Sequence, residues 1–290
     1  MKKILLFAAA ALALVACGKG SKDNVAPQFT WESNAKFAEM EIGKNMDAVI
    51  TATVPGGVTV LTVTATIPTK LVGMAEQLIG ISANKANESL LVFDFIKDGK
   101  CASSLRSFVS VSSGTSSFKM DFSKLLDALI GSAELPNGAK FTFKVHVEDG
   151  NENKKDCQAL FKWTAGPTFE VKGSTPYELG SGNELAVNIT APGKIEKLTI
   201  SFTGAEQALS YVKKRMGGST SVDIASNADV ATALGLPTNT ANATSAKLDF
   251  AELLKDLSYE VSVPSTTTIT VKVEDVLGKT AEQALSIVKK

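Results

Sequence analysis

The chain's only histidine, His146, is the first residue to consider for catalysis or metal binding. A serine–histidine triad or a histidine-ligated metal would have to use it. Apolar residues alternate with it across residues 141–147, and this period of two puts them on one face of a strand and His146 on the other. Lys272 holds the matching position in a second copy of the stretch. A position that also accepts lysine is most simply solvated, so we predict neither a catalytic residue nor a metal ligand.

Oxygen-bearing side chains continue beyond that strand at Asp149, Asn151, Asn153 and Asp156. Their spacing resembles that of a calcium-binding loop, but the glycine and the final glutamate that such a loop needs are missing. The stretch after Asp275, in the second copy, has no such side chains. We therefore predict a plain hairpin turn and no cofactor.

Other patterns that would mark an enzyme or a nucleic-acid-binding protein are missing from the sequence. It has no glycine-rich phosphate loop, no Cys-x-x-Cys and no His-x-x-x-His pattern. Acidic residues are numerous, so a glycoside hydrolase with a carboxylate pair stays open as a third, remote alternative. The formal net charge is zero, and the basic run at residues 213–215 is too short to argue for nucleic acid. The sequence predicts a non-enzymatic protein.

Aromatic side chains could stack on sugars. Trp31 matches Val171 in the repeat, and Trp163 lies close to the place of Val288. Large residues that exchange with valine usually belong to a core. The tyrosines are the better candidates for exposed contacts: Tyr177, Tyr211 and Tyr259.

A helix-like stretch followed by a strand-like stretch occurs twice and organises the chain. Residues 119–129 and 247–257 share the pattern Asp-Phe-x-x-Leu-Leu, which suits a short amphipathic helix. Residues 141–149 and 268–275 alternate apolar and polar side chains and end in Val-Glu-Asp, which suits a strand entering a hairpin. A Pro-x-Phe start, a strand ended by Pro-Gly and an earlier helical stretch also recur. This predicts two modules of one plan rather than a solenoid.

The predicted fold is mainly β, with two tandem immunoglobulin-like β-sandwich modules that carry short helical insertions. A chain of 290 residues is long for one core and suits two. We expect module 1 at residues 27–165 and module 2 at residues 166–290, joined by a hinge at residues 164–166. Module 2 contains a complete copy of the plan and no cysteine, so it is expected to fold by itself.

The N-terminus has the pattern of a secretion signal. Lysines precede an apolar run at residues 4–15, which is too short for a bilayer span of roughly 20 residues. The run ends in Leu-Val-Ala before Cys17, which resembles a bacterial lipobox. The resemblance implies a lipoprotein signal peptide at residues 1–16, acylation of Cys17 and a lipidated tether at residues 17–26. Several acyl chains would hold the protein stably at a membrane.

The residue after Cys17 is glycine, not aspartate. By resemblance to lipoprotein sorting, this favours the outer membrane over the inner membrane. Which leaflet the anchor occupies, and hence whether the protein lies on the cell surface, stays open.

Two further cysteines, Cys101 and Cys157, both fall in module 1. Outside the cytoplasm such a pair can form a disulfide. Two buried free thiols are the alternative, and the sequence leaves both open. Module 2 has the same plan without a cysteine, so the bond is not a requirement of the fold.

Over its whole length the chain resembles the tandem immunoglobulin-like surface lipoproteins of the Bacteroidales, most of which have no known function. The resemblance rests on the lipobox, the Pro-x-Phe module starts, the Asp-Phe-x-x-Leu-Leu helices and the Val-Glu-Asp turns. It implies a cell-envelope address and a sandwich fold, and it carries over no site residue.

Residues 81–117 and 217–246 do not match each other, although both lie between the same two helical stretches. Loops on a fixed scaffold are where binding surfaces usually vary, so any partner is expected at this end of one module. Module 1 is preferred because aromatic and charged residues mix there. The candidate contacts are Phe93, Phe95, Arg106 and Phe108. The alternative is that both segments only cap the open end of the sandwich.

The predicted function is that of a membrane-anchored, non-enzymatic envelope lipoprotein whose modules bind a glycan or a protein partner outside the cell. The alternative is a structural adhesin or pilus-like subunit. Such subunits usually need a donor strand from a neighbour, whereas both modules here have their own closing strand.

Overall fold

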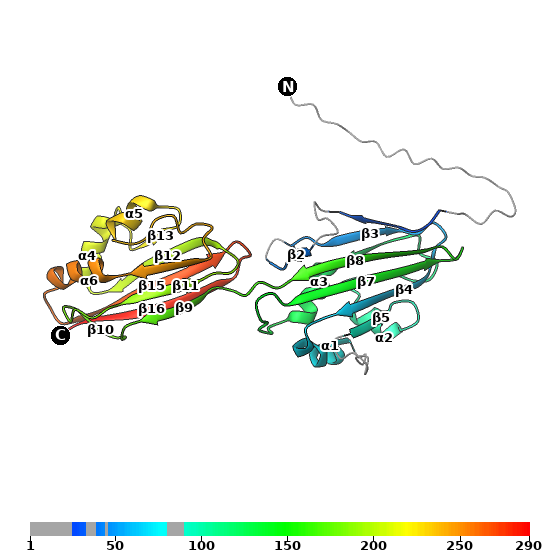
Figure 1. Ribbon diagram of the computed structural model, residues 1–290, viewed down its shortest axis with the longest axis horizontal. Coiled ribbons are helices and arrows are strands. Elements are labelled where there is room, and N and C mark those ends of the chain that lie inside the picture. The colour runs from blue at the N-terminus through cyan, green and yellow to red at the C-terminus, as the bar shows by residue number, and fades with distance from the viewer. Residues whose placement is uncertain (1–24, 33–38, 44–45, 80–89) are drawn as a thin grey trace, which may run out of the picture.

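The computed structural model describes residues 25–32, 39–43, 46–79 and 90–290. The predicted signal peptide and the predicted acylation site at Cys17 lie outside these residues. In the described part of the chain, no helix has the length and apolar character needed to cross a membrane. Figure 1 shows two β-sandwich modules placed end to end, with the C-terminus at the end of module 2 that faces away from module 1.

The two modules are built from the same series of elements. Those of module 1 are β1 (Gln28–Trp31), β2 (Glu39–Glu41), β3 (Val49–Thr53), β4 (Val58–Thr66), the 3-10 helix η1 (Thr69–Leu71), α1 (Val72–Ile79), β5 (Leu90–Asp94), α2 (Gly99–Ser104), β6 (Ser117–Asp121), α3 (Phe122–Ile130), β7 (Lys140–Asp149) and β8 (Lys154–Lys162). Those of module 2 are β9 (Thr168–Lys172), β10 (Tyr177–Glu178), β11 (Ala186–Thr190), β12 (Ile195–Gly204), α4 (Glu206–Arg215), β13 (Ser221–Asp223), α5 (Ala228–Ala233), β14 (Ser245–Asp249), α6 (Ala251–Glu260), β15 (Ser265–Asp275) and β16 (Thr280–Lys289).

The sheet topology is also the same in both modules. In module 1 the sheet β1-β3-β6 faces the sheet β2-β8-β7-β4-β5, and in module 2 the sheet β9-β11-β14 faces the sheet β10-β16-β15-β12-β13. β2 runs parallel to β8 and β10 runs parallel to β16, next to an antiparallel final hairpin in each module. A small sheet packed on a larger one that holds the final hairpin is the immunoglobulin-like arrangement. The predicted fold class is confirmed.

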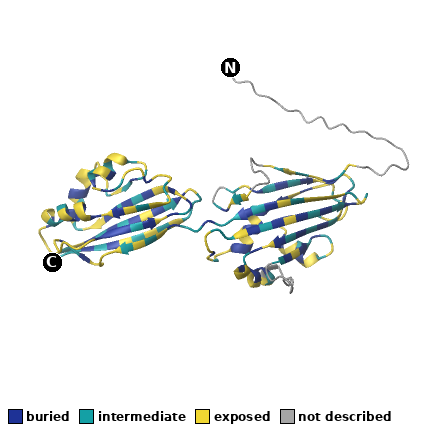
Figure 2. Cartoon of the chain, viewed as in Figure 1, coloured by how far each residue is buried: buried dark blue, intermediate teal, exposed yellow. Residues whose placement is uncertain are grey.

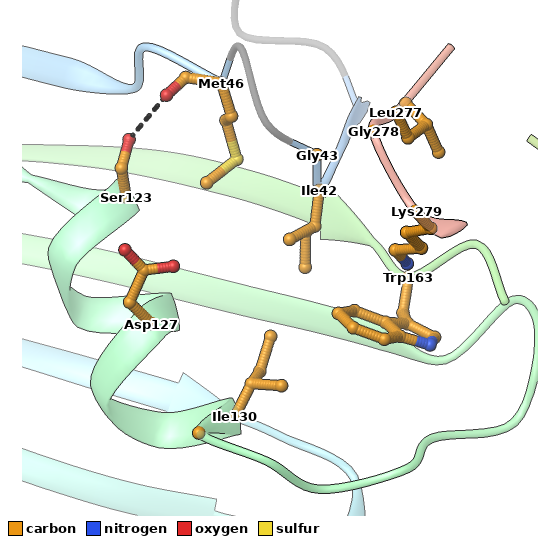
Figure 3. A pocket seen from close by; sticks show the side chains of 11 residues that line it. Ile42, Gly43, Met46, Ser123, Asp127, Ile130, Trp163, Leu277, Gly278 and Lys279 are labelled. Atoms are coloured by element: carbon orange, nitrogen blue, oxygen red, sulfur yellow. Dashed lines mark hydrogen bonds between the residues drawn. The ribbon is translucent and has the colours of Figure 1, made fainter. Parts of the chain in front are cut away.

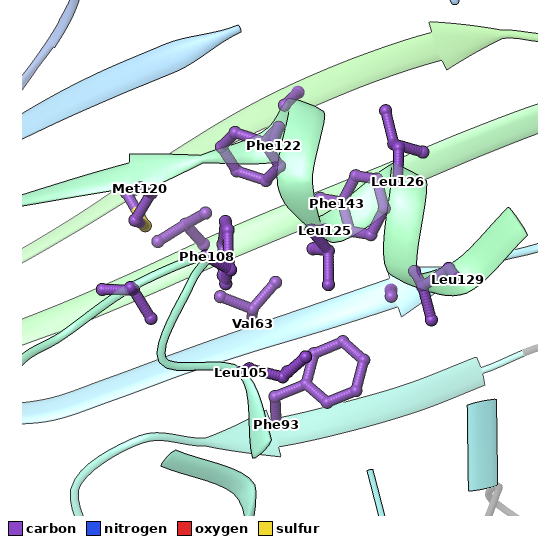
Figure 4. Close-up of a cluster of buried hydrophobic side chains, with 14 of the residues drawn as sticks. Val63, Phe93, Leu105, Phe108, Met120, Phe122, Leu125, Leu126, Leu129 and Phe143 are labelled. Atoms are coloured by element: carbon purple, nitrogen blue, oxygen red, sulfur yellow. The ribbon is translucent and has the colours of Figure 1, made fainter. Parts of the chain in front are cut away.

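Each module has its own apolar core between its sheets. Figure 2 shows buried and exposed residues alternating along the long strands, as expected for strands with one face inward. In module 1 the core centres on Phe122, whose ring centroid lies 5.1 Å from that of Phe108 and 5.4 Å from that of Phe143. Figure 4 shows these rings converging with the leucines of α3. Burying such rings and leucines supplies the main favourable free energy of folding.

The predicted amphipathic helices are α3 and α6. The Asp121 side chain accepts a hydrogen bond from the backbone N–H of Lys124 and so caps the start of α3. Leu125, Leu126 and Leu129 are buried along one side of α3, and the leucines of α6 are buried in the same way. Each helix closes the sandwich beside the small sheet.

The segments whose sequences do not match between the modules share one local structural plan. β5 and β13 each extend the larger sheet, next to β4 and β12. Each is followed by a short helix with an N-cap side chain, Asp98 before α2 and Asn227 before α5. A buried leucine then ends each helix, Leu105 in one and Leu234 in the other. Residues 81–89 lie outside the described part of the chain.

A buried aspartate holds the turn of the final hairpin in both modules. The Asp149 carboxylate accepts hydrogen bonds from the backbone N–H groups of Asn151 and Asn153, at 2.9 and 2.8 Å. Asp275 accepts the same pair from Leu277 and Lys279, at 3.0 and 2.8 Å. The aspartate therefore serves the turn itself, in agreement with the predicted plain hairpin.

Candidate functional site at the module junction

The tip of the β15–β16 hairpin of module 2 rests on the end of module 1. Leu277 packs so closely on Gly43 that a Cβ atom added to Gly43 would lie 2.9 Å from the Leu277 Cβ atom. Real Cβ atoms do not approach other carbon atoms so closely, so any side chain at Gly43 would push the hairpin away. The close approach makes the junction a fitted contact, with a glycine where the hairpin needs room.

Lys279, on the same hairpin, reaches across to the chain that leaves module 1. Its Nζ atom lies 3.2 Å from the centre of the Trp163 ring, and it donates a hydrogen bond to the backbone carbonyl of Thr164. Burial lowers the pKa of Lys279, while the nearby carboxylates of Asp275 and Glu41 favour its charged form. A cation over an aromatic ring contributes about 0.5–2 kcal/mol, more as water is excluded.

A pocket of about 620 Å³ opens between these elements. Figure 3 shows Ile130 and Trp163 facing into it from module 1, with Lys279 reaching over the tryptophan from module 2. Its lining combines apolar and polar side chains from both modules: Ile42, Gly43, Met46, Ser123, Asp127, Ile130, Gly131, Trp163, Leu277, Gly278 and Lys279.

One face of α3 forms a wall of this pocket. Ser123, Asp127 and Ile130 recur there at helical spacing. Ser123 fixes the opposite rim, because its hydroxyl donates to the Met46 carbonyl at 3.1 Å and accepts from the Ala48 N–H at 3.2 Å. Asp127 is exposed and adds one carboxylate to a wall that also holds the Ser123 hydroxyl and the apolar side chain of Ile130. The pocket can hold an apolar group that also carries a hydrogen-bond donor.

The predicted ligand contacts lie elsewhere, and three of the four are buried. Phe93, Phe95 and Phe108 are 0%, 2% and 2% exposed, so they belong to the core of module 1. Their rings form a chain of contacts, with centroids 6.4 Å apart for Phe93 and Phe95 and 5.7 Å apart for Phe95 and Phe108. Burial removes all three from direct contact with a partner, and this part of the prediction is wrong. Arg106 alone is exposed.

Cys101 and Cys157 are both free thiols. Cys157 lies on β8, whereas Cys101 lies on α2, which follows β5, and two strands separate β8 from β5. Burial raises the pKa of Cys101 to about 11 and that of Cys157 to about 12, so both stay protonated at neutral pH.

His146 lies on the outer face of β7, as predicted, between two carboxylates. Its Nδ1 atom lies 2.6 Å from Asp156 and its Nε2 atom lies 2.9 Å from Glu148. The hydrogen bond to Glu148, and then that to Asp156, raises the pKa of His146 above its ordinary value of 6.5. Asp156, which the calcium-loop spacing included, therefore faces His146 and not the turn.

Sequence reasoning missed the junction residues. The repeat predicts a core position for Trp163, and its side chain does pack half-buried against the core of module 1. The strand register makes Lys289 its counterpart in module 2. The one available signal was the difference between the two hairpin tips, Leu277 and Lys279 against Asn151 and Asn153. Such a difference marks the hairpin that touches another module.

Comparison with known protein families and with curated proteins gives no match. Several solved structures show a weak likeness. A tetra-tandem repeat from the extending region of a large adhesion protein is 11% identical with a TM-score of 0.25, covering 91% of this chain and 49% of that one. A 1.5-MDa bacterial ice-binding adhesin is 13% identical with a TM-score of 0.30, covering 91% and 64%. The FN1–FN3 domains of chicken CNTN1 are 11% identical with a TM-score of 0.25, covering 87% and 65%.

The chain thus spans about half the length of the adhesion-protein repeat, 49%. At these identities and TM-scores the likenesses do not bear on function. The strand order alone defines the class, a tandem immunoglobulin-like β-sandwich protein with a fitted junction between its modules.

Proposed function

We propose that this chain is a non-enzymatic binding protein of the cell envelope, anchored by lipid on Cys17, that carries two immunoglobulin-like modules as one arm toward a protein or glycan outside the cell. The signal-like residues 1–16 and the tether at residues 17–26 supply the anchor. The outer membrane is the proposed address, with the modules exposed at the cell surface.

The junction is the observation that carries this proposal. The Lys279 contact with Trp163 and the Leu277 contact with Gly43 tie module 2 to module 1 in one orientation. β1 starts at the opposite end of module 1, where Gln28 pairs with Thr53. An anchor before β1 would therefore hold the near end of the arm, and the far end of module 2 would point away from the membrane. Figure 1 shows module 2 extending from the other end of module 1.

Fractionation of cells that make the Cys17→Ser variant tests the anchor. The wild-type protein should stay with the outer-membrane fraction and be digested by protease added to whole cells. Cys17→Ser should leave the membrane fraction, since acyl chains are the proposed hold. A signal-cleaved, unacylated Cys17→Ser protein that stays with the membrane would contradict the proposal.

Binding is tested separately on the purified full chain in detergent. The chain is applied to a glycan array and to an array of host and bacterial surface proteins. Saturable binding to one class, kept when His146 is replaced by lysine, would support a binding role without a catalytic histidine. Turnover of a glycoside substrate panel would overturn the non-enzymatic assignment, and ladder formation on a non-denaturing gel would favour the adhesin or pilus-like alternative.

A further inference from the structure

The surface of module 1 that receives the module 2 hairpin recurs at the far end of module 2. The strand register establishes the match. Met40 pairs with Phe161 in module 1 as Tyr177 pairs with Ile287 in module 2. Just after these pairs, the Ile42 N–H donates to Lys162, and the Leu179 N–H donates to Val288. The next residue is glycine in both modules, Gly43 in one and Gly180 in the other.

The helix walls match as well. The same Asp-Phe pair stands at the start of α3 and of α6, so Ser123, Asp127 and Ile130 correspond to Ala251, Lys255 and Ser258. All three residues of α6 line a pocket of about 390 Å³, together with Gly180, Tyr177 and Tyr259. The junction pocket and this end pocket are therefore one feature of the module plan, present twice.

The junction pocket has a hairpin seated against it, whereas the end pocket has none. At Gly43 an added Cβ atom would collide with Leu277 of the seated hairpin, whereas at Gly180 an added Cβ atom would meet no other atom within 4 Å. Tyr259, in the lining of the end pocket, is 77% exposed. Tyr177 in the same lining and Tyr211 are buried, at 5% and 9% exposed, so the prediction of exposed contacts is wrong for these two tyrosines. An exposed ring next to an open pocket marks a contact surface. We call this surface the end seat: Tyr177, Gly180, Lys255, Ser258 and Tyr259.

One charge in the helix wall differs between the two copies. Asp127 lines the junction pocket, although the carboxylates that favour the charged form of Lys279 are those of Asp275 and Glu41, and Glu41 corresponds to Glu178 in module 2. In the end seat lysine replaces that aspartate at Lys255, and Lys289 replaces Trp163. Lys255 is exposed in the lining of this seat, so a hairpin that brings an acidic residue near it would complement its charge.

We propose that the end seat binds the tip of a β-hairpin that carries an acidic residue, presented by another protein. The proposal rests on the proposed function and narrows its partner to a protein. Seat and hairpin would meet as they do at the junction, with an apolar side chain against Gly180 and a carboxylate near Lys255.

A second copy of this chain is the less suitable occupant. Its own free hairpin, between β7 and β8, has the same turn, and Glu152 is exposed there. That hairpin lies at the end of module 1 where β1 begins. The proposed tether would hold it against the membrane, out of reach of the far end of a neighbouring arm.

The test uses the full chain in detergent, labelled with 3-fluorotyrosine, because its three tyrosines give three fluorine NMR signals. Tyr177 and Tyr259 line the end seat, while Tyr211 hydrogen-bonds to Asp256 and serves as the internal control. The probe is a cyclised peptide of residues 274–280 with Lys279→Glu, which copies the seated hairpin with its charge reversed. A second peptide keeps Lys279.

We expect the glutamate peptide to shift the Tyr259 signal and leave Tyr211 unchanged. Lys255→Glu in the chain should weaken that binding at least tenfold and let the lysine peptide bind instead. An unchanged Tyr211 signal verifies that Lys255→Glu is folded. The end seat would be overturned if the Tyr259 signal did not shift at millimolar peptide. It would also be overturned if the glutamate and lysine peptides shifted that signal equally in the wild type and in Lys255→Glu. A Tyr259 shift that grows with chain concentration, without peptide, would overturn the choice of another protein over a second copy.

These outcomes are independent of the anchor. Failure of the peptide to bind, with Cys17→Ser still released from membranes, would remove the end seat and leave the proposed function standing. Failure of the anchor test would remove the envelope address without affecting the fluorine NMR result.

Discussion

In module 1, substitutions of a core side chain and of a surface side chain should differ measurably in their effect on stability. Phe108 lies in contact with Phe95 and Phe122, whereas Arg106, close to it in sequence, is exposed. We expect Phe108→Ala to cost about 3–5 kcal/mol of unfolding free energy, because it opens a cavity among aromatic rings. Arg106→Ala should stay within about 0.5 kcal/mol of the wild type. Urea denaturation measures both, and a Phe108→Ala variant of unchanged stability would return this ring to the candidate contacts.

His146 should make the stability of module 1 depend on pH. Its hydrogen bonds to Glu148 and Asp156 raise its pKa in the folded state above 6.5. The stabilisation of the folded state by charged His146 is therefore complete below pH 6.5. It is lost as the pH rises through the higher pKa that His146 has in the folded state. Proton NMR of the single histidine should show a titration midpoint above 6.5.

Module 2 supplies the control for this effect. Lys272 stands across from Glu282 there, as His146 stands across from Asp156. The His146→Lys variant should keep its melting temperature between pH 6 and pH 9, where the wild type loses some. Two results together would show that the carboxylates do not stabilise the charged form of His146. These are a titration midpoint at or below pH 6.5, and melting temperatures of the wild type and of His146→Lys that depend on pH in the same way.

Sequence reasoning placed residues by alternation and by repeat, and it succeeded where one face of a strand decides burial. The outward position of His146 and the inward positions of Phe141 and Phe143 followed from period two. It failed for Phe93, Phe95 and Phe108 because their segment seemed to have no partner in the repeat. Burial there depends on β5 joining the sheet beside β4, a long-range pairing that local pattern does not show.

At the scale of elements, the Pro-Gly turn packs closely against the final hairpin in each module because its glycine has no side chain. A Cβ atom on Gly56 would lie 2.7 Å from the Asp149 carboxylate, and Gly193 meets Asp275 in the same way. Neither glycine has a positive φ angle, so alanine fits the backbone and only the space is lacking. We expect Gly56→Ala and Gly193→Ala each to cost about 1–3 kcal/mol, because overpacking displaces a buried carboxylate.

Gly73 is the matched control. It lies in α1, where an added Cβ atom would meet no other atom within 4 Å. Gly73→Ala should therefore stabilise module 1 by about 0.5–1 kcal/mol through helix propensity. Thermal unfolding of the three variants tests whether the two turn substitutions destabilise the protein while Gly73→Ala stabilises it. Unchanged stability of both turn variants would show that the close packing of turn and hairpin is not required.

The turn glycines were recognised from the sequence as turn residues, and the aspartate was recognised as part of a hairpin. Their contact was not, because it joins residues about ninety positions apart, as Gly56 and Asp149 show. The same limit applies to α2 and α5. Their N-caps, Asp98 and Asn227, follow an aspartate at the end of the preceding strand, Asp94 and Asp223, and this spacing was the only local sign that the segments correspond.

At the scale of the whole molecule, the cores of the two modules are separate. We propose that the boundary lies between residues 165 and 166 and that residues 166–290 fold alone. That fragment contains every strand of both module 2 sheets. Calorimetry should give one cooperative transition for it, and a fragment without such a transition would argue for a shared core.

The repeat and the fold class followed from the sequence because each copy repeats its periodicity and its turns. The junction did not, since it depends on which end of one copy meets the other. No local pattern marks the junction residues Trp163, Lys279 and Gly43. They come together only because the hairpin of module 2 lies against module 1. The end seat is the same surface at the far end of module 2, without a hairpin on it, so no local sequence pattern marks it.

The central claim is that the two modules form one arm with a fixed junction. Residual dipolar couplings of the full chain in detergent test it most directly, because they report the orientation of each module independently. The account predicts that a single alignment tensor fits the amides of both modules. It also predicts that Lys279→Glu, which removes the cation over Trp163 and repels the carboxylate of Glu41, gives two different tensors, while Lys214→Glu at an exposed position of α4 keeps one. Two unequal tensors in the wild-type chain would contradict the arm.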